Sequence, residues 1–153
     1  MRKWSMAAGA FVLTIVAATS AAQTPNRPGG VVILKADDVQ WSDYPGRPGV
    51  KVAVIEGDMT KPGPFMMRVK FPANYKLAPH THPGIEHTTV LSGAMHLGYG
   101  TSPDGTTEVL PAGTVILTPP GTPHFFWTSE ETIVQTHGTG PWASTPVKSP
   151  LAP

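Results

Sequence analysis

The stretch 79–93 (PHTHPGIEHTTVLSG) limits the possible folds of this chain more than any other. Successive side chains on a β-strand point to opposite faces, so His80 and His82 lie on the same face. The Pro-Gly pair at 83–84 is a strong turn signal, and such a turn brings Glu86 on the next strand beside the two imidazoles. Two imidazoles and a carboxylate from adjacent strands suit a divalent transition metal such as Fe, Mn, Ni, Zn or Cu.

A second stretch offers a third imidazole. After Gly113 the sequence PPGTPH ends at His124, again behind a turn rich in Pro and Gly. Alone, His124 is more simply interpreted as a hydrogen-bonded histidine at a strand end, and a single H-x-H pair recurs by chance. The two stretches together favour one metal site formed by His80, His82, Glu86 and His124.

Both stretches resemble the sequence motifs of the cupin superfamily. Four positions match the first motif, G-x5-H-x-H-x3,4-E-x6-G: His80, His82, Glu86 and Gly93. Four more match the second, G-x5-P-x-G-x2-H-x3-N: Gly113, Pro119, Gly121 and His124. Asn74 stands where the first motif opens with Gly, and Thr128 where the second closes with Asn; neither position is a metal ligand in the family.

The resemblance covers residues 51–137. It implies an all-β fold, the cupin double-stranded β-helix or jelly-roll barrel. It also implies one divalent transition metal per chain, held by the three histidines and the glutamate. The two departures concern turn geometry and barrel packing.

Length and composition agree with one all-β domain. With 153 residues the chain can form one core but not two, and 18 Pro and 16 Gly with 14% charged residues are typical of short strands joined by turns. We assign the barrel to residues 31–142, with a first strand at 31–35 and no helix. Trp41 and Tyr44, in a turn-rich loop, either cover an end of the barrel or lie on its outer surface. There is no Cys, which excludes disulfides and thiolate ligands.

The two ends lie outside the predicted barrel. Residues 1–22 have a basic start, an apolar run and small residues before Gln23, as a secretory signal peptide does; an uncleaved anchor is the alternative. Residues 23–30 are predicted to be a flexible leader, and residues 143–153 a Pro-rich tail that covers the surface or frays. We therefore expect a periplasmic or secreted protein without stable membrane insertion after cleavage. Removing Arg2 and Lys3 changes the formal charge from +1 to −1, and no basic patch indicates nucleic acid.

Two residues are candidates for proton transfer near the metal. A site of three His and one Glu leaves positions open on a five- or six-coordinate metal, as catalytic sites do, whereas structural sites are usually closed. Glu86 and His137 are the candidate catalytic residues, although a strand-end histidine near Trp142 explains His137 equally well. His87 follows Glu86 directly and is expected to face away from the metal.

Four further residues are candidates for the substrate pocket: Arg68, Met95, Phe126 and Gln135. Arg68, flanked by Met67 and Val69, either neutralises an anionic substrate or forms an ion pair at the barrel edge. Gln135 shares the strand parity of His137.

The resemblance implies a metal-dependent enzyme acting on a small organic molecule, with a dioxygenase-type oxidoreductase favoured. The alternatives are a cupin that binds or senses a ligand without turnover, and a metal-dependent isomerase or decarboxylase. Because residues 31–34 are apolar on both faces of a predicted edge strand, we also expect a homodimer.

Overall fold

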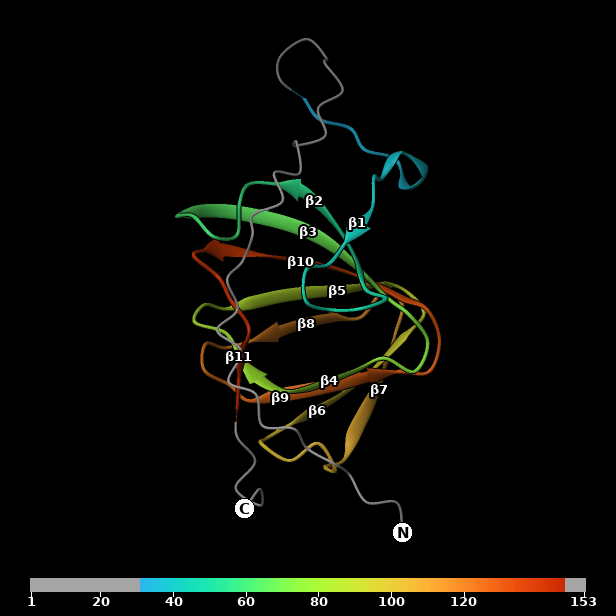
Figure 1. Ribbon diagram of the computed structural model, residues 1–153, viewed down its shortest axis with the longest axis vertical. Helices are drawn as coiled ribbons and strands as arrows, with labels where there is room; N and C mark the ends of the chain where they lie inside the picture. The colour runs from blue at the N-terminus through green and yellow to red at the C-terminus, as the bar shows by residue number, and fades with distance from the viewer. Residues whose placement is uncertain (1–30, 148–153) are drawn as a thin grey trace.

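The computed structural model describes residues 31–147, and within them nearly every regular element is a β-strand. The larger sheet has the order β1-β2-β3-β10-β5-β8, with bounds Ser42–Asp43, Lys51–Glu56, Gly63–Phe71, Thr132–Gly140, Glu86–Ser92 and Val115–Thr118. The smaller sheet has the order β11-β4-β9-β6-β7, with bounds Thr145–Pro146, Lys76–Thr81, His124–Thr128, Ala94–Tyr99 and Thr107–Pro111. Figure 1 shows the larger sheet above and the smaller one below. The predicted all-β jelly roll is confirmed.

The core lies between the two sheets, and strand parity decides which side chains enter it. On β3, Phe65, Met67 and Val69 are buried, while Arg68 and Lys70 are more exposed. The same alternation continues on the neighbouring strands, where Val90 and Val134 are buried. Burial of these apolar side chains is the main favourable term for a fold of this kind.

The two departures from the cupin motifs meet at one corner of the barrel. Asn74 has φ 62°, a left-handed conformation that Gly and Asn tolerate best. Its N–H donates to the carbonyl of Thr128 (2.8 Å), and the Thr128 N–H donates to Tyr75 (3.0 Å). The Thr128 hydroxyl, fully buried, donates to the Pro72 carbonyl (2.7 Å). Asn74 and Thr128 therefore preserve the turn into β4.

Gly93 closes the first motif for a steric reason. Its φ is +71°, and a Cβ atom there would lie 2.5 Å from the Glu131 carbonyl oxygen and 2.8 Å from the Thr132 hydroxyl. A side chain at this turn between β5 and β6 would therefore push the chain at 131–132 away.

The structure differs from the predicted first strand and extends the smaller sheet into the predicted tail. Residues 31–35 form no strand; they precede the 3-10 helix η2 (Ala36–Asp38), and the first strand is β1. The predicted tail is structured up to residue 147, because β11 pairs with β4 at Thr81 and His80 and the Val147 N–H donates to Pro79 (2.9 Å). The sequence 143–147 could not reveal this, since a strand of two residues, one of them Pro146, carries no periodicity.

Other expectations for the ends lie outside the described residues. These are the signal peptide at 1–22, the leader at 23–30 and the tail beyond residue 147. Between residues 31 and 147 no helix is long and apolar enough to span a membrane.

The two aromatic residues of the first loop take different positions. The Lys70 ammonium, on the outer face of β3, lies 4.9 Å from the centroid of the Trp41 ring. Tyr44 lines the internal cavity and packs against the core.

Candidate metal centre

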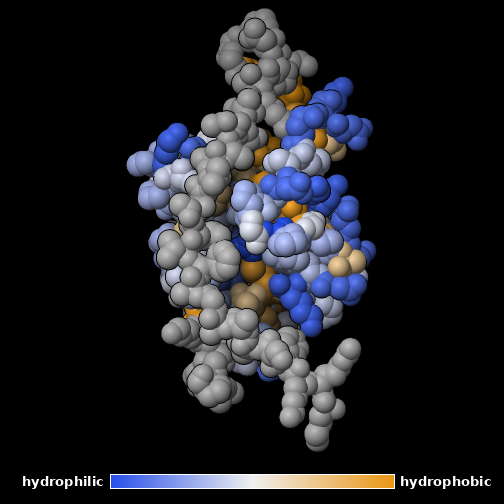
Figure 2. All heavy atoms as spheres, in the orientation of Figure 1, coloured by the Kyte–Doolittle hydropathy of each residue, from blue (hydrophilic) through white to orange (hydrophobic). Residues whose placement is uncertain are grey.

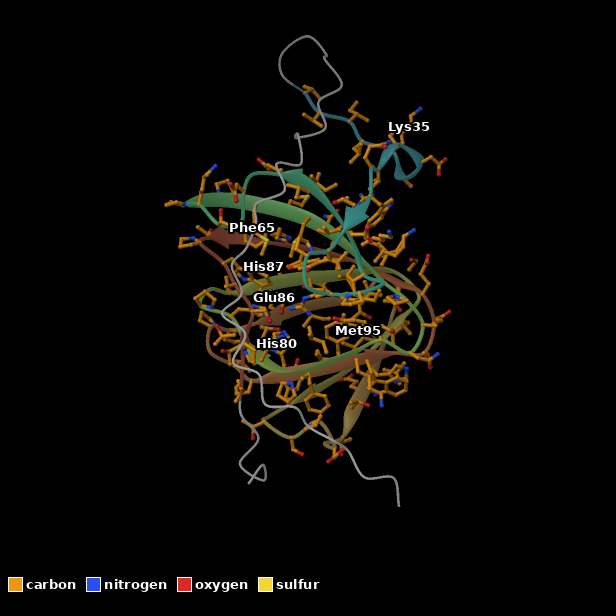
Figure 3. All side chains as sticks on the ribbon, viewed as in Figure 1. Lys35, Phe65, His80, Glu86, His87 and Met95 are labelled. Carbon is orange, nitrogen blue, oxygen red and sulfur yellow. The ribbon has the colours of Figure 1, made fainter. Side chains whose placement is uncertain are left out.

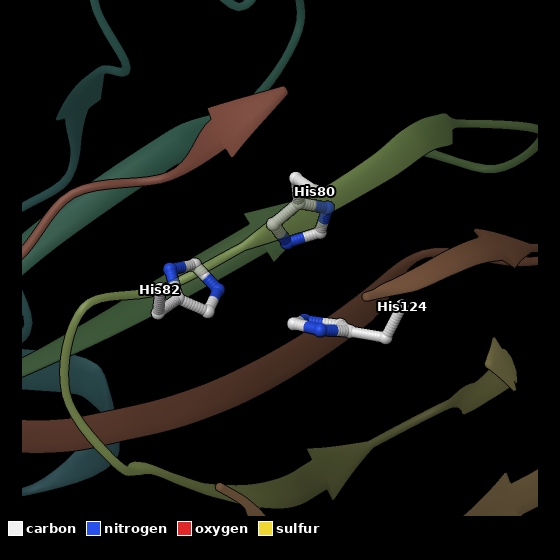
Figure 4. A group of neighbouring side chains, drawn as sticks. All are labelled: His80, His82 and His124. Carbon is white, nitrogen blue, oxygen red and sulfur yellow. The ribbon is translucent and has the colours of Figure 1, made fainter. Parts of the chain in front are cut away.

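Three histidines from the smaller sheet converge at the mouth of the barrel. His80 on β4 is the direct cross-strand partner of His124 on β9, and His82 follows β4 by one residue. One ring nitrogen from each lies within 4.8 Å of the others, and all three side chains are buried. Figure 4 shows the three rings around one common space. The predicted parity of the H-x-H pair and the predicted position of His124 therefore bring all three together.

Each imidazole is oriented by a backbone carbonyl. Nδ1 of His80, His82 and His124 lies 2.9, 2.8 and 3.0 Å from the carbonyl oxygens of Ala78, Ala143 and Thr122. A carbonyl only accepts, so Nδ1 carries the proton and Nε2 keeps its lone pair. This arrangement is the usual outer shell of metal-ligating histidines. His82 Nε2 is buried without any hydrogen-bond partner among the described residues, which fits a nitrogen whose lone pair can bind a metal.

Glu86 adds a carboxylate from the larger sheet. As the first residue of β5, it places Oε2 3.4 Å from His124 Nε2 and 3.7 Å from His82 Nε2. Figure 3 shows His80 and Glu86 between the sheets. Burial alone would raise the pKa of Glu86, but His124 and His82 together lower it, so the carboxylate is ionised at neutral pH. Three imidazoles and one carboxylate suit a divalent transition metal.

Burial sets the charge of two of the histidines. It lowers the pKa of His80 to about 4, with the neighbouring His124 adding to the effect, and it also lowers the pKa of His82. Both are therefore neutral at pH 7 and can offer a lone pair. Burial acts in the same direction on His124, but Glu86, together with the Thr122 carbonyl, outweighs burial and raises the pKa of His124. A raised pKa favours the protonated imidazole, so a metal cation would compete with a proton for His124.

The four residues lie in the wall of one cavity of about 60 Å³, room for a few waters or part of a small ligand. Most of its wall is apolar, including Met67, Val69, Ile116 and Val134, and the predicted pocket residues Met95 and Phe126 belong to it. Figure 2 shows hydrophobic residues beside hydrophilic ones near the middle of the face in view.

The prediction is wrong for two of the four pocket residues. Arg68 and Gln135 do not line the cavity; they face each other across β3 and β10 on the outer side of the larger sheet. There the Arg68 Nε–H donates to the Gln135 side-chain oxygen (3.1 Å). The physical reason is parity, because Met67 and Val69 on either side of Arg68 point inward.

The prediction of His137 as a proton-transfer residue is also wrong. His137 is exposed on the outer face of β10, and its ring stacks on that of His87 with centroids 4.7 Å apart. This stacking also places His87 on the outer face of the larger sheet, so the expectation that it faces away from the metal is confirmed. The cavity side of β10 is formed instead by Val134 and Thr136.

Sequence reasoning missed the cavity roles of Arg47 and Trp142. Trp142 stacks on the His82 ring, with centroids 4.0 Å apart and an interplanar angle of 12°. Arg47 enters the cavity wall from the loop between β1 and β2. Neither has a motif spacing that could have revealed it; only the PGRPG turn around Arg47 hinted at an ordered loop.

The fold and the site define a cupin. The family model described as the ChrR cupin-like domain matches residues 30–143, and the chain belongs to this family. No curated protein matches the chain significantly.

Solved structures show the same fold. The polyketide cyclase RemF from Streptomyces resistomycificus has 23% identity and a TM-score of 0.60, over 79% of this chain and 86% of that one. KdgF from Halomonas sp. has 20% identity and a TM-score of 0.54, over 78% and 98%. Salicylate 1,2-dioxygenase from Pseudoaminobacter salicylatoxidans has 14% identity and a TM-score of 0.54, over 65% and 29%. At these identities the likeness concerns the fold alone.

Proposed function

We propose that this protein is a mononuclear metal-dependent enzyme that acts on a small organic molecule, with dioxygenation as the favoured reaction. The observation that carries the proposal is the convergence of three backbone-oriented imidazoles and Glu86 on a cavity whose other walls are mainly apolar. A site with open positions facing a cavity is what a catalytic metal needs, and a closed structural site has none. The dioxygenase among the structures of the same fold adds weight to this choice.

The chain's own residues have separable tasks in such a reaction. His80, His82 and His124 would hold the metal, which supplies Lewis-acid or redox chemistry when bound. The apolar walls exclude water and orient an organic substrate. Glu86 is the carboxylate that could hold a substrate proton, because His137 lies on the opposite side of the sheet.

One observation favours a second function, binding or sensing without turnover. His137 lies outside the cavity. Apart from His80, His82 and His124, Glu86 is then the only side chain of the described cavity wall that carries a carboxylate or an imidazole, so proton transfer depends on Glu86. A binding protein needs no such group. An isomerase or decarboxylase remains within the metal-dependent proposal and differs in not consuming O₂.

Oxygen consumption with isotope labelling tests the proposal. The chain is loaded separately with Fe(II), Mn(II), Ni(II), Zn(II) and Cu(II) and given a panel of small phenols and carboxylic acids under ¹⁸O₂. We expect one redox-active metal to support uptake of O₂ with both labelled atoms in the product, a balance that needs no outside reductant. Saturable binding without a product under any metal would refute the enzyme and favour the binding protein.

We also propose that the protein is exported, on the composition of residues 1–22. Intact-mass measurement on protein from the periplasmic or culture fraction should show these 22 residues missing. A full-length cytosolic product would contradict this. The homodimer stays a prediction, although the strand at 31–35 on which it was based is not formed.

A further inference from the structure

The loop between β1 and β2 is folded onto the cavity by its own backbone. The Tyr44 N–H donates to the Val50 carbonyl (2.9 Å), the Arg47 N–H to Tyr44 (3.1 Å) and the Val50 N–H to Arg47 (3.1 Å). Val50 is completely buried in the core, which anchors the end of the loop. Arg47 is therefore held on an ordered turn.

The Arg47 side chain has aromatic neighbours but no acidic one. Its guanidinium lies 5.2 Å from the centroid of the Tyr44 ring, and Nη1 donates to the Tyr75 hydroxyl (3.4 Å). In residues 31–147, Arg47 forms no ion pair with any carboxylate. Arg68, by contrast, is satisfied by Gln135 on the outer surface. A fork of N–H donors in a cavity wall without an acidic partner is suited to binding a carboxylate.

Two further polar atoms in the same wall lack partners. Trp142 Nε1 and Thr118 Oγ1 are buried, and neither has a hydrogen-bond partner within the described part of the chain. The two side chains are 6% and 2% exposed. Indole N–H can only donate, and buried polar groups are normally satisfied. Both residues belong to the cavity wall, and a ligand with oxygen acceptors that reached these atoms would satisfy them.

We propose that the cavity takes a small organic carboxylate, with Arg47 binding the carboxylate group and Trp142 donating to an oxygen of the ligand. This inference rests on the proposed function, and it names the substrate class of that site. The apolar walls then contact the organic body of the ligand.

Binding of a matched pair of probes tests the inference. Benzoate and benzamide have the same size and ring, and differ in charge. Titration calorimetry on the full chain, metal-free and loaded with Zn(II), should show benzoate binding at least about tenfold more tightly than benzamide, as a charge-assisted pair provides. Arg47→Gln should bring the ratio of the benzoate affinity to the benzamide affinity close to one, and Arg47→Lys should retain part of the preference for benzoate. Arg68→Gln, which removes an arginine on the outer face, should leave the ratio unchanged.

The outcomes separate an anion-binding role from a structural one. If Arg47 only supports the loop, Arg47→Gln weakens both probes alike and the ratio persists, which overturns the inference. Failure of the wild-type chain to prefer benzoate overturns it too. Trp142→Phe keeps an aromatic ring, although a smaller one, and removes the indole N–H; it should weaken both probes, because each has a carbonyl-type oxygen. Unchanged affinity for both would remove Trp142 from the proposed contact.

Zinc content, measured on the same samples, separates this inference from the proposed function. Stoichiometric zinc without benzoate preference means that the carboxylate site is wrong and the metal centre stands. Benzoate preference in protein that binds no zinc means that the metal centre is wrong and the carboxylate site stands.

Discussion

We expect the double variant His82→Ala, His124→Ala to bind no stoichiometric metal, whereas the wild-type chain binds about one transition metal ion. The variant keeps His80 and Glu86, which come from different sheets and cannot saturate a transition metal by themselves. Mutation of groups that merely orient a ligand typically costs about 10–100-fold in metal affinity, so the loss of two ligands should exceed that. Equilibrium dialysis followed by elemental analysis measures the occupancy.

A matched control is available on the outer face of the larger sheet. The variant His87→Ala, His137→Ala also removes two neighbouring imidazoles, but these stack on each other away from the cavity. It should retain wild-type occupancy. Full occupancy in the His82, His124 variant would remove these residues as ligands and with them the metal centre.

Thermal unfolding gives a second readout of the same change. A metal that binds only the folded state stabilises it by about 2.7 kcal/mol when its concentration is 100 times Kd. The wild type and the outer-face control should therefore show a metal-dependent rise in Tm. The His82, His124 variant should show none, which also separates lost binding from lost folding.

The convergence of the candidate metal-binding residues could be predicted because it follows from local geometry. Strand parity places His80 and His82 on one face, and the Pro-Gly turn at 83–84 returns the chain so that Glu86 meets them. His124 needed the second motif, since its contact with His80 joins residues far apart in the sequence. The fold followed from the same two motifs.

The errors on the last long strand have a definite cause. On β10 the residues that face the core include Thr132 and Thr136, while the outer face carries Ile133, Gln135 and His137. Polarity therefore does not distinguish the two faces of this strand, and the wrong parity was chosen. The Thr136 hydroxyl is satisfied inside by the Thr88 hydroxyl (2.9 Å), a pairing that the sequence does not reveal.

The remaining site residues depend on tertiary contacts of irregular segments. Trp142 and Ala143 both hold His82, one by ring stacking and the other through a carbonyl. They lie directly after β10, where no periodicity marks a buried role. Arg47 lies in a loop whose position depends on the burial of Val50. Such contacts require the packed structure, because turn signals locate a bend and not its direction.

The second large effect concerns Glu86, which should matter for reactivity beyond holding the metal. We expect Glu86→Gln to keep part of the metal affinity, because the three imidazoles remain. Turnover should fall by about 10²–10⁴-fold at equal metal occupancy, the usual contribution of a positioned acid or base. Glutamine preserves the shape of the side chain and removes both its charge and its ability to accept a proton. The rates are compared on whichever substrate the wild type accepts, after occupancy has been matched by elemental analysis.

A second Glu→Gln variant shows whether the effect is specific to the position of Glu86. Glu108→Gln makes the same change at an exposed position on β7, and it should leave both occupancy and rate unchanged. Equal rates for Glu86→Gln and wild type at equal occupancy would mean that Glu86 is a replaceable tether. Apart from His80, His82 and His124, the described cavity wall holds no other carboxylate or imidazole that could then take over proton transfer.

The metal-free protein offers a readout of Glu86 that needs no substrate. Burial acts to lower the pKa of His124, and contact with Glu86 reverses the effect and raises it. Glu86→Gln removes the anion while the burial remains, so the pKa of His124 should fall below its ordinary value of about 6.5. An NMR titration of the His124 ring in both variants measures this. In the wild type the Glu86–His124 contact favours the protonated imidazole, so its stabilisation is present below the unfolded-state pKa and is lost as pH rises through the folded-state value. A His124 pKa that does not move would show that the carboxylate and the imidazole are uncoupled, and Glu86 would then lose its place in the metal centre.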